Sequence, residues 1–195
     1  MSKFNKLYEE IIKKDHPIFK PASKEEIEKR KDTKFQRWLD EEIESGNITK
    51  NSDGTYDAKD NVSISDMRLT KIPIQFNKVN GDFFCYMNKL TSLKGAPEKV
   101  TGGFYCSFNN LTSLKGCPEK VGGNFYCPET NLTSLKGAPK EVTGDFYCSY
   151  NKLTSLEGAP EKVGGDFACY HQKNDHTFTR EEVEDVCKVK GSIKL

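Results

Sequence analysis

The sequence predicts an α+β protein, in which a solenoid with a six-rung parallel β-sheet follows N-terminal helices and is closed by a C-terminal helix. The main observation is a strict 21-residue period in a chain of 195 residues. Three columns carry it: Phe83, Phe104, Phe125, Phe146 and Phe167; Cys85, Cys106, Cys127, Cys148 and Cys169; Leu90, Leu111, Leu132 and Leu153. A second observation is that residues 1–46 and 174–195 lack the period and have helical spacing instead. A fixed period of this length indicates stacked copies of one supersecondary unit.

Residues 1–46 are expected to form an N-terminal helical segment with two helices. Residues 3–14 place apolar side chains at helical spacing. A second helix is expected to begin at Ser23, which forms a capping box with Glu26, and to end at Gly46. The apolar face of this second helix comprises Ile27, Phe35, Trp38, Leu39 and Ile43.

Residues 47–61 are expected to form a hairpin that caps the solenoid. The dipeptide Asp53-Gly54 supplies the turn, because it tolerates positive φ. The solenoid itself is expected over residues 62–173. Its first rung begins at Val62, which lies 21 residues before Phe83. Successive side chains of a strand alternate between its two faces, so Phe and Cys of each rung point into the core and the residue between them points outward.

The rest of each unit supports an elongated fold without helices. Gly116 and Pro118 break any helix, so the side opposite the sheet is expected to be extended or 3₁₀. One column is expected to turn inward and to bind backbone groups of neighbouring rungs: Asn88, Asn109, Thr130 and Asn151. Pro128-Glu129-Thr130 interrupts the pattern in mid-array and predicts a local irregularity there.

Residues 174–195 are expected to form a C-terminal capping helix and a tail. Thr179 and Glu182 form a capping box, and Phe178 with Val183 forms a hydrophobic staple. The apolar face of this helix comprises Val183, Val186 and Cys187. We expect it to cover the last rung, as terminal repeats require.

Cysteine content and charge indicate a cytoplasmic protein. Of the seven cysteines, five stand at equivalent positions, where parallel side chains in a core cannot all pair. We therefore expect buried free thiols and a reducing compartment. The net charge of +1 gives no strong attraction to nucleic acid or to anionic membranes. No segment has the features of a signal peptide or a membrane span.

The repeat unit resembles the leucine-rich repeat. It places a strand Phe-x-Cys before Asn, then Leu-x-x-Leu, then Pro, with Phe and Cys in the place of the usual strand leucines. The repeat segment "NKLTSLKGAPEKVTGGFYC" is similar in sequence to leucine-rich-repeat proteins encoded by tailed bacteriophages. The resemblance covers roughly residues 48 to 195. The resemblance implies a right-handed leucine-rich-repeat solenoid, encoded by a phage and present in the cytoplasm of its bacterial host.

Catalytic and metal-binding motifs are not found, so neither an enzyme nor a cofactor is expected. The sequence contains no Gly-x-Ser-x-Gly, no phosphate-binding loop and no His-Glu-x-x-His. Cys169, His171, His176 and Cys187 are the candidates for a metal site. The alternative gives the two cysteines roles in the core and places the two histidines on the surface. The spacing of the four residues does not match a zinc motif, and no metal site is expected.

The outward columns of the sheet are the candidate partner-binding site, on a face that we expect to be concave. The candidate residues are Phe84, Tyr86, Met87, Tyr105, Phe108, Tyr126, Glu129, Tyr147, Tyr150 and Tyr170. Exposed Tyr and Phe have the composition of protein-binding hot spots. The structural alternative is that stacked tyrosines only stabilise the sheet. For Asp82, Asp145 and Asp166 at the strand starts, contact with a basic partner and simple solvation stay equally open.

The function expected is a non-enzymatic protein–protein interaction. By the phage resemblance, the partner is a bacterial host protein such as a defence factor, which the chain would bind and inhibit. The alternative is a structural component of the virion or of its assembly, docked through the N-terminal helices. Binding of nucleic acid by stacking on the aromatic residues is disfavoured, because such grooves are basic and this flank is acidic.

Overall fold

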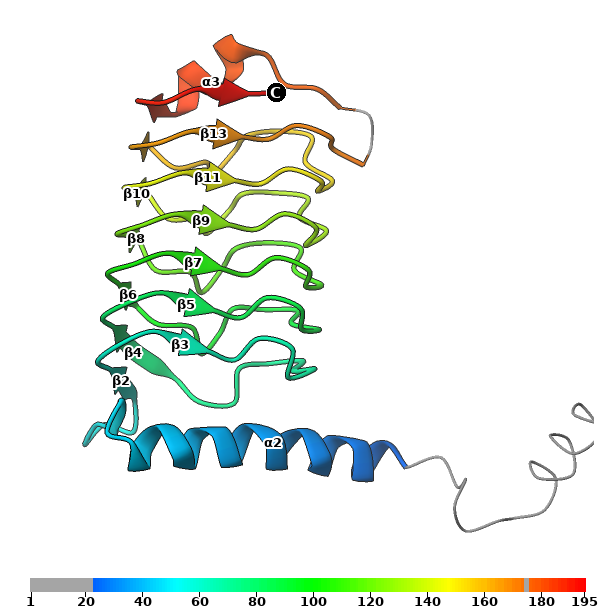
Figure 1. Ribbon diagram of the computed structural model, residues 1–195. Coiled ribbons are helices and arrows are strands. Elements are labelled where there is room, and N and C mark those ends of the chain that lie inside the picture. Colours follow the sequence, from blue (N-terminus) through cyan, green and yellow to red (C-terminus); the bar gives the residue numbers. More distant parts are fainter. Residues whose placement is uncertain (1–22, 174–175) are drawn as a thin grey trace, which may run out of the picture.

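The described part of the chain folds as a parallel β-solenoid of about five turns with one helix at each end (Figure 1). The structure is a computed structural model that describes residues 23–173 and 176–195. The helix expected at residues 3–14 lies outside the described residues, and so do the side chains of Glu26 and Ile27. The stacked parallel repeats predicted by the 21-residue period are confirmed: Phe83 pairs with Phe104, and Phe104 pairs with Phe125.

Helix α2 (Lys24–Glu44) lies across the N-terminal end of the solenoid (Figure 1). Phe35 and Leu39 are buried, and the Trp38 ring lies 5.3 Å from that of Phe35. Ile43 was expected on the same apolar face, but it is 40% exposed. Each i to i+4 step advances about 40° beyond a full turn, so Ile43, two steps after Phe35, has rotated away from the buried stripe.

An antiparallel hairpin follows helix α2 and joins it to the solenoid. Strand β1 (Ile48–Lys50) pairs with β2 (Tyr56–Ala58), and the turn between them holds Gly54 at φ +86°. The carboxylate of Asp53 accepts the backbone N–H of Thr55 at 2.9 Å, which closes the turn. Strand β2 then pairs in parallel with β4 (Phe76–Val79), so the hairpin extends one sheet of the solenoid.

The first sheet contains the strands that the phenylalanine and cysteine columns predict. Its seven strands are parallel and lie in the order β15-β13-β11-β9-β7-β5-β3. They are β3 (Val62–Ser63), β5 (Phe83–Phe84), β7 (Phe104–Tyr105), β9 (Phe125–Tyr126), β11 (Phe146–Tyr147), β13 (Phe167–Ala168) and β15 (Ile193–Lys194). The six rungs expected are therefore not confirmed, because residues beyond the C-terminal helix return and add β15 as a seventh strand.

A second sheet of eight strands was not predicted. It continues from the hairpin in the order β1-β2-β4-β6-β8-β10-β12-β14. Its later strands are β6 (Lys99–Val100), β8 (Lys120–Val121), β10 (Glu141–Val142), β12 (Lys162–Val163) and β14 (Lys188–Val189). Each of β6, β8, β10 and β12 leads through a glycine corner into the first sheet. A Cβ at Gly122 in one such corner would lie 2.0 Å from the carbonyl oxygen of Thr101, so the turns approach too closely there for any side chain.

The core is built from five stacked columns of side chains, two of which are leucine columns. The phenylalanine rings of successive rungs lie 5.3–5.5 Å apart, and the cysteine column beside them is buried. Leucines and the valines of the second sheet complete it. The inward orientation of Phe and Cys is therefore confirmed. All seven cysteines are free thiols.

The asparagine column turns inward and binds backbone groups, as predicted. The Asn109 amide donates to the carbonyl oxygens of Cys85 at 3.0 Å and Cys106 at 2.9 Å, and its Oδ1 accepts the N–H of Leu90 at 3.0 Å. Gln172, which was not among the predicted members, occupies the same column, and its Oε1 accepts the N–H of Leu153. These buried amides satisfy the backbone where the chain leaves the sheet.

The irregularity predicted at Pro128-Glu129-Thr130 is present and local. Asn131 adopts φ +69°, whereas the equivalent Asn110 does not have positive φ. The strand pairs on both sides keep their register. The interruption thus changes one turn and leaves the stacking intact.

The C-terminal cap is helix α3 (Arg180–Val186) followed by strands β14 and β15. The capping box of Thr179 and Glu182 is present, and both Phe178 and Val183 are buried. Val186, expected on the apolar face, is 42% exposed, because three residues advance a helix about 60° short of a full turn. The helix and the two strands together close the last turn (Figure 1).

Candidate functional site

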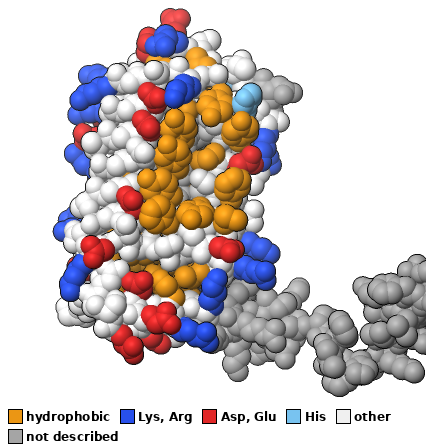
Figure 2. Space-filling view, viewed as in Figure 1, with side chains coloured by type: hydrophobic (Ala, Val, Ile, Leu, Met, Phe, Trp, Pro, Cys, Tyr) orange, Lys and Arg blue, Asp and Glu red, His pale blue; other side chains and the backbone are white. Residues whose placement is uncertain are grey.

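Four aromatic rings form a continuous stack on the outer face of the first sheet. This tyrosine ladder consists of Phe84, Tyr105, Tyr126 and Tyr147, one from each of β5, β7, β9 and β11. Successive ring centroids lie 4.8, 5.5 and 4.6 Å apart, with interplanar angles of 17°, 14° and 7°. Figure 2 shows hydrophobic side chains gathered in a strip along this face.

The ladder presents ring edges and hydroxyl groups to the solvent, because each inner ring has neighbours on both faces. Burial raises the pKa of Tyr126, and the neighbouring Tyr147 raises it further; for Tyr105, Asp82 adds to the effect of burial. At the end of the ladder, Lys194 Nζ lies 3.5 Å from the Tyr147 hydroxyl oxygen and 2.7 Å from an Asp166 carboxylate oxygen. The sequence did not indicate Lys194 as part of this face, because it reaches Tyr147 only through the pairing of strand β15 with β13.

A second column runs beside the ladder, just beyond the strand ends. This left-handed column comprises Met87, Phe108, Glu129, Tyr150 and His171, with φ angles from +52° to +58°. Met87, Phe108 and Tyr150 are 54%, 56% and 40% exposed. Positive φ is uncommon outside glycine, and for bulky side chains it is a conformational outlier. Residue type does not predict this conformation here, because Met, Phe and Tyr have no preference for the left-handed region.

Between the ladder and the left-handed column lie Tyr86, Ser107, Pro128, Ser149 and Tyr170. Tyr86 at one end is 37% exposed. At the other end Tyr150, Tyr170 and His171 form an aromatic cluster with ring centroids 5.2–5.7 Å apart. The Ser149 hydroxyl is buried and has no hydrogen-bond partner among the described residues.

The structure brings all ten candidate residues onto one face. They occupy three adjacent columns, which together we call the aromatic face. Glu129 differs from the others, since its carboxylate forms an ion pair with Lys173 at 2.9 Å. Ala168, the next outward residue after Tyr147, is buried and does not extend the exposed face.

The acidic residues at the strand starts have a structural role, which differs from both contact with a basic partner and simple solvation. The Asp82 carboxylate accepts the N–H of Gly103 at 2.6 Å, and that of Asp145 accepts the N–H of Asp166 at 2.8 Å. Asn61 and Asn124 make the same contact to the next rung. This polar ladder ties successive corners together, because each side chain pairs a backbone group that the bend leaves free.

The described residues contain no group of three or more His, Cys, Asp or Glu side chains placed to hold a metal ion. Cys169 lies in the cysteine column and Cys187 follows helix α3, where both are buried. Burial raises the pKa of the Cys169 thiol to about 12 and that of Cys187 to about 11. These thiols are protonated at neutral pH and are poor nucleophiles.

Comparison with known proteins gives no relative from which a role could be transferred. No family model matches the chain, no curated protein matches it, and no solved structure matches it. Within the described part of the chain, no helix is long and apolar enough to span a membrane. The candidate role therefore depends on the chemistry of the aromatic face.

Proposed function

We propose that this chain is a non-enzymatic module that binds a protein partner with its aromatic face. The observation that carries the proposal is the left-handed column. Three of its members, Met87, Phe108 and Tyr150, are large apolar residues that combine high exposure with positive φ. Large apolar side chains are unfavourable in the isolated chain at exposed positions with this backbone conformation, and contact with a partner would account for their presence there.

The fold itself does not require apolar residues in this column. Asp66 occupies the equivalent position one rung before Met87, also at positive φ. Aspartate, asparagine and glycine adopt this conformation readily and are well solvated. At this position the first turn has the polar Asp66, whereas the turns that carry the tyrosine ladder have Met87, Phe108 and Tyr150, with Glu129 as the one charged residue among them.

The purely structural alternative explains only the ladder. Ring-on-ring contact between Tyr105, Tyr126 and Tyr147 stabilises the sheet whether or not a partner binds. It gives no reason for Met87 and Phe108, whose side chains are more than half exposed. Protein interfaces, by contrast, are enriched in Met and in aromatic residues.

Binding of nucleic acid by stacking is disfavoured by the same geometry. Stacking needs open ring faces, and the inner rings of the ladder have a neighbour on each face. Asp82 and Asp145 beside the ladder add negative charge, which repels phosphates. A protein surface can instead contact ring edges and accept or donate hydrogen bonds at the hydroxyls.

The partner class follows from the resemblance of the repeats to phage leucine-rich-repeat proteins. We propose a bacterial host protein, such as a defence factor, that loses activity when the aromatic face is bound to it. The leucine-rich-repeat class and the phage origin are part of this proposal, and it is made by analogy.

The test is a capture experiment from bacterial lysate, followed by titration of each captured protein. The variant Phe108→Asn/Tyr150→Asn removes two apolar side chains and fits the left-handed backbone. We expect it to lose the partner, and Tyr126→Ala/Tyr147→Ala to weaken binding as well. The matched control, Ile43→Asn/Val186→Asn, removes two exposed apolar residues outside the face and should bind normally. Unchanged affinity in both face variants would refute the proposal, and co-purification with virions instead would favour a structural component.

A further inference from the structure

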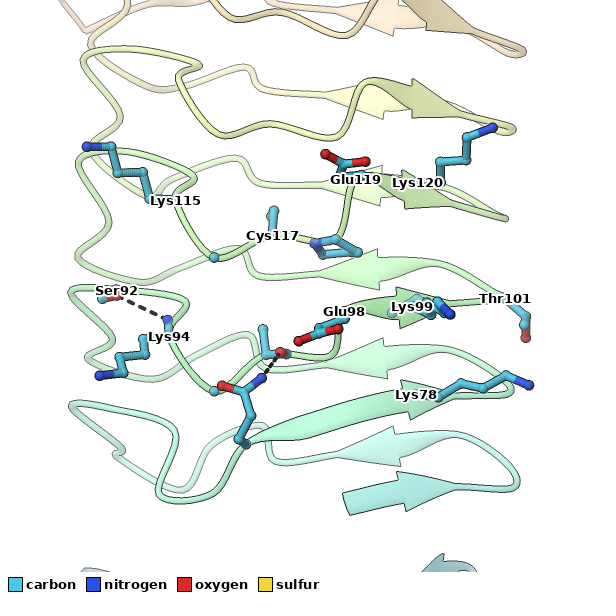
Figure 3. A pocket seen from close by; sticks show the side chains of 16 residues that line it. Lys78, Ser92, Lys94, Glu98, Lys99, Thr101, Lys115, Cys117, Glu119 and Lys120 are labelled. Carbon is cyan, nitrogen blue, oxygen red and sulfur yellow. Dashed lines mark hydrogen bonds between the residues drawn. The ribbon is translucent and has the colours of Figure 1, made fainter. Parts of the chain in front are cut away.

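A groove with a volume of about 920 Å³ lies on the second sheet, away from the aromatic face. It runs between strands β6 and β8 and the bends around Lys94 and Lys115 (Figure 3). Its floor is apolar and comprises Ala96, Val100, Cys117 and Pro118. Cys117 stands where the following turns have Ala138 and Ala159. A concave apolar surface of this size is typical of small-molecule sites.

Five lysines line the groove and two glutamates oppose them. Lys94 and Lys115 lie on one side, and Lys78, Lys99 and Lys120 lie on the other, with the glutamates Glu98 and Glu119 between them (Figure 3). The lining therefore carries a net charge of 5 − 2 = +3, whereas the whole chain carries +1.

Ion pairs do not remove this excess. Lys120 pairs with Glu141 at 2.7 Å, and Glu119 pairs with Lys140 at 3.3 Å. Among the described residues, the other four lysines of the groove make no ion pair, and Glu98 is the one glutamate of the lining that is likewise unpaired. The unpaired charge is thus 4 − 1 = +3. Lysines placed only for solubility would be interspersed with acidic residues rather than gathered around an apolar floor.

We infer that this groove binds a small amphipathic anion, with its apolar part on the floor and its carboxylate or phosphate against the lysines. A longer polyanion fits less well. The groove continues along the solenoid into a hollow of about 480 Å³, where Lys115 and Lys140 face Glu119 and Glu161. That section is neutral (2 − 2 = 0), so the attraction for an anion is limited to the first section. The inference concerns another sheet and does not depend on the partner of the aromatic face.

The test is a titration of the full chain with dodecanoate and dodecyl phosphate, followed by calorimetry at concentrations below micelle formation. Dodecanol and dodecyltrimethylammonium are the neutral and cationic probes. We expect saturable binding of the anions, at least about tenfold tighter than either control probe. The two anions distinguish a carboxylate from a phosphate ligand.

Variants locate the site. Lys99→Glu/Lys115→Glu should weaken anion binding by at least about tenfold, and Glu98→Gln should tighten it. Lys162→Glu/Lys188→Glu is the matched control, because it makes the same charge change on β12 and β14 outside the groove. Circular dichroism establishes that each variant is folded. The inference is refuted by absent saturation, by equal binding of dodecanol, by equal loss in the control variant, or by binding of an acidic peptide in place of the amphiphiles.

Discussion

Asn151 accepts hydrogen bonds from both the backbone N–H and the side-chain hydroxyl of Thr130, at 3.1 and 2.9 Å. Its Oδ1 also accepts the N–H of Leu132 at 3.0 Å. Asn151 therefore supports the previous rung as the other buried amides do. Thr130 does not do the same in turn, because its side chain is one bond shorter than that of asparagine and its hydroxyl lies against Asn151 and the carbonyl of Cys127. Within the described chain, the N–H of Leu111 consequently lacks the acceptor that its equivalents have.

Thr130→Asn should therefore stabilise the protein. The new Oδ1 would accept the Leu111 N–H, and the new amide would donate to Cys106 and Cys127 as its equivalents do. A buried hydrogen bond of this kind contributes about 1 kcal/mol to the free energy of unfolding. Urea denaturation measures the change in the free energy of unfolding. An unchanged value would mean that a water molecule already accepts the hydrogen bond of the Leu111 N–H.

The reciprocal change, Asn109→Thr, should destabilise the protein by about 1–3 kcal/mol. It removes the acceptor of the Leu90 N–H and a donor to two buried carbonyl groups. The same urea experiment applies. Equal stability of this variant and wild type would contradict the role assigned to the amide column.

Phe108→Asn should be more stable than Phe108→Ala by about 0.5–1 kcal/mol. Both substitutions remove the ring, but asparagine adopts positive φ more readily than alanine. Thermal and urea unfolding of the two variants measure the difference. The reverse order would mean that the backbone relaxes out of the left-handed region once the ring is gone.

Stability should fall as pH rises above about 8.5. Burial raises the pKa of the core thiols in the folded state, whereas an unfolded cysteine titrates near about 8.5. Below that pH both states hold the proton, so the thiols contribute no pH dependence. Above it only the unfolded state releases protons, and the free energy of unfolding decreases with pH.

The number of thiols sets the slope of this alkaline loss. All seven are free, and the two with the least perturbed pKa values reach about 11 and about 12 in the folded state. Urea titrations between pH 8 and 10.5 should therefore show a slope of several protons. Replacing Cys106 and Cys148 by alanine should reduce that slope, and an unchanged slope would assign the effect to other groups.

Gly137→Ala should destabilise the fold far more than Gly54→Ala. Both glycines have nearly equal positive φ, +87° and +86°. A Cβ at Gly137 would lie 2.6 Å from the backbone nitrogen of Lys115, whereas none of the surroundings of Gly54 comes within 4 Å. We expect a loss of about 1 kcal/mol at Gly54 from backbone strain alone and at least about 3 kcal/mol at Gly137. Similar losses would show that adjacent turns can separate at little cost.

The sequence predicted the first sheet because its signal is repeated and apolar. Phe and Cys alternate with an outward residue in every unit, so direction and register followed from the period. The second sheet escaped prediction because each of its repeated strands contributes one inward residue, such as Val100, and therefore shows no alternation, whereas Phe and Cys mark every rung of the first sheet. Strands β14 and β15 escaped because helix α3 lengthens the last spacing. Lys188-Val189-Lys190-Gly191 nevertheless repeats Lys162-Val163-Gly164-Gly165, and that similarity could have located them.

The aromatic face was predicted in composition but not in geometry. Alternation placed Tyr105, Tyr126 and Tyr147 outward, and they lie there. The conformation of Phe108 and its equivalents could not be anticipated, because it is imposed by the bend of the chain between stacked turns. The role of Asp82 and Asp145 in joining corners depends likewise on which backbone groups the bend leaves unpaired.

The in-register pairing of identical positions, such as Phe104 with Phe125, also bears on how this protein can change in evolution. Removal or duplication of one whole unit in the coding sequence would join the same residue types across the new junction and leave both terminal caps unaltered. The length of the aromatic face would then change in increments of about 4.8 Å, one sheet spacing at a time. The area that the aromatic face offers for contact could in this way be adjusted by recombination between repeats, without new side chains and without a new fold.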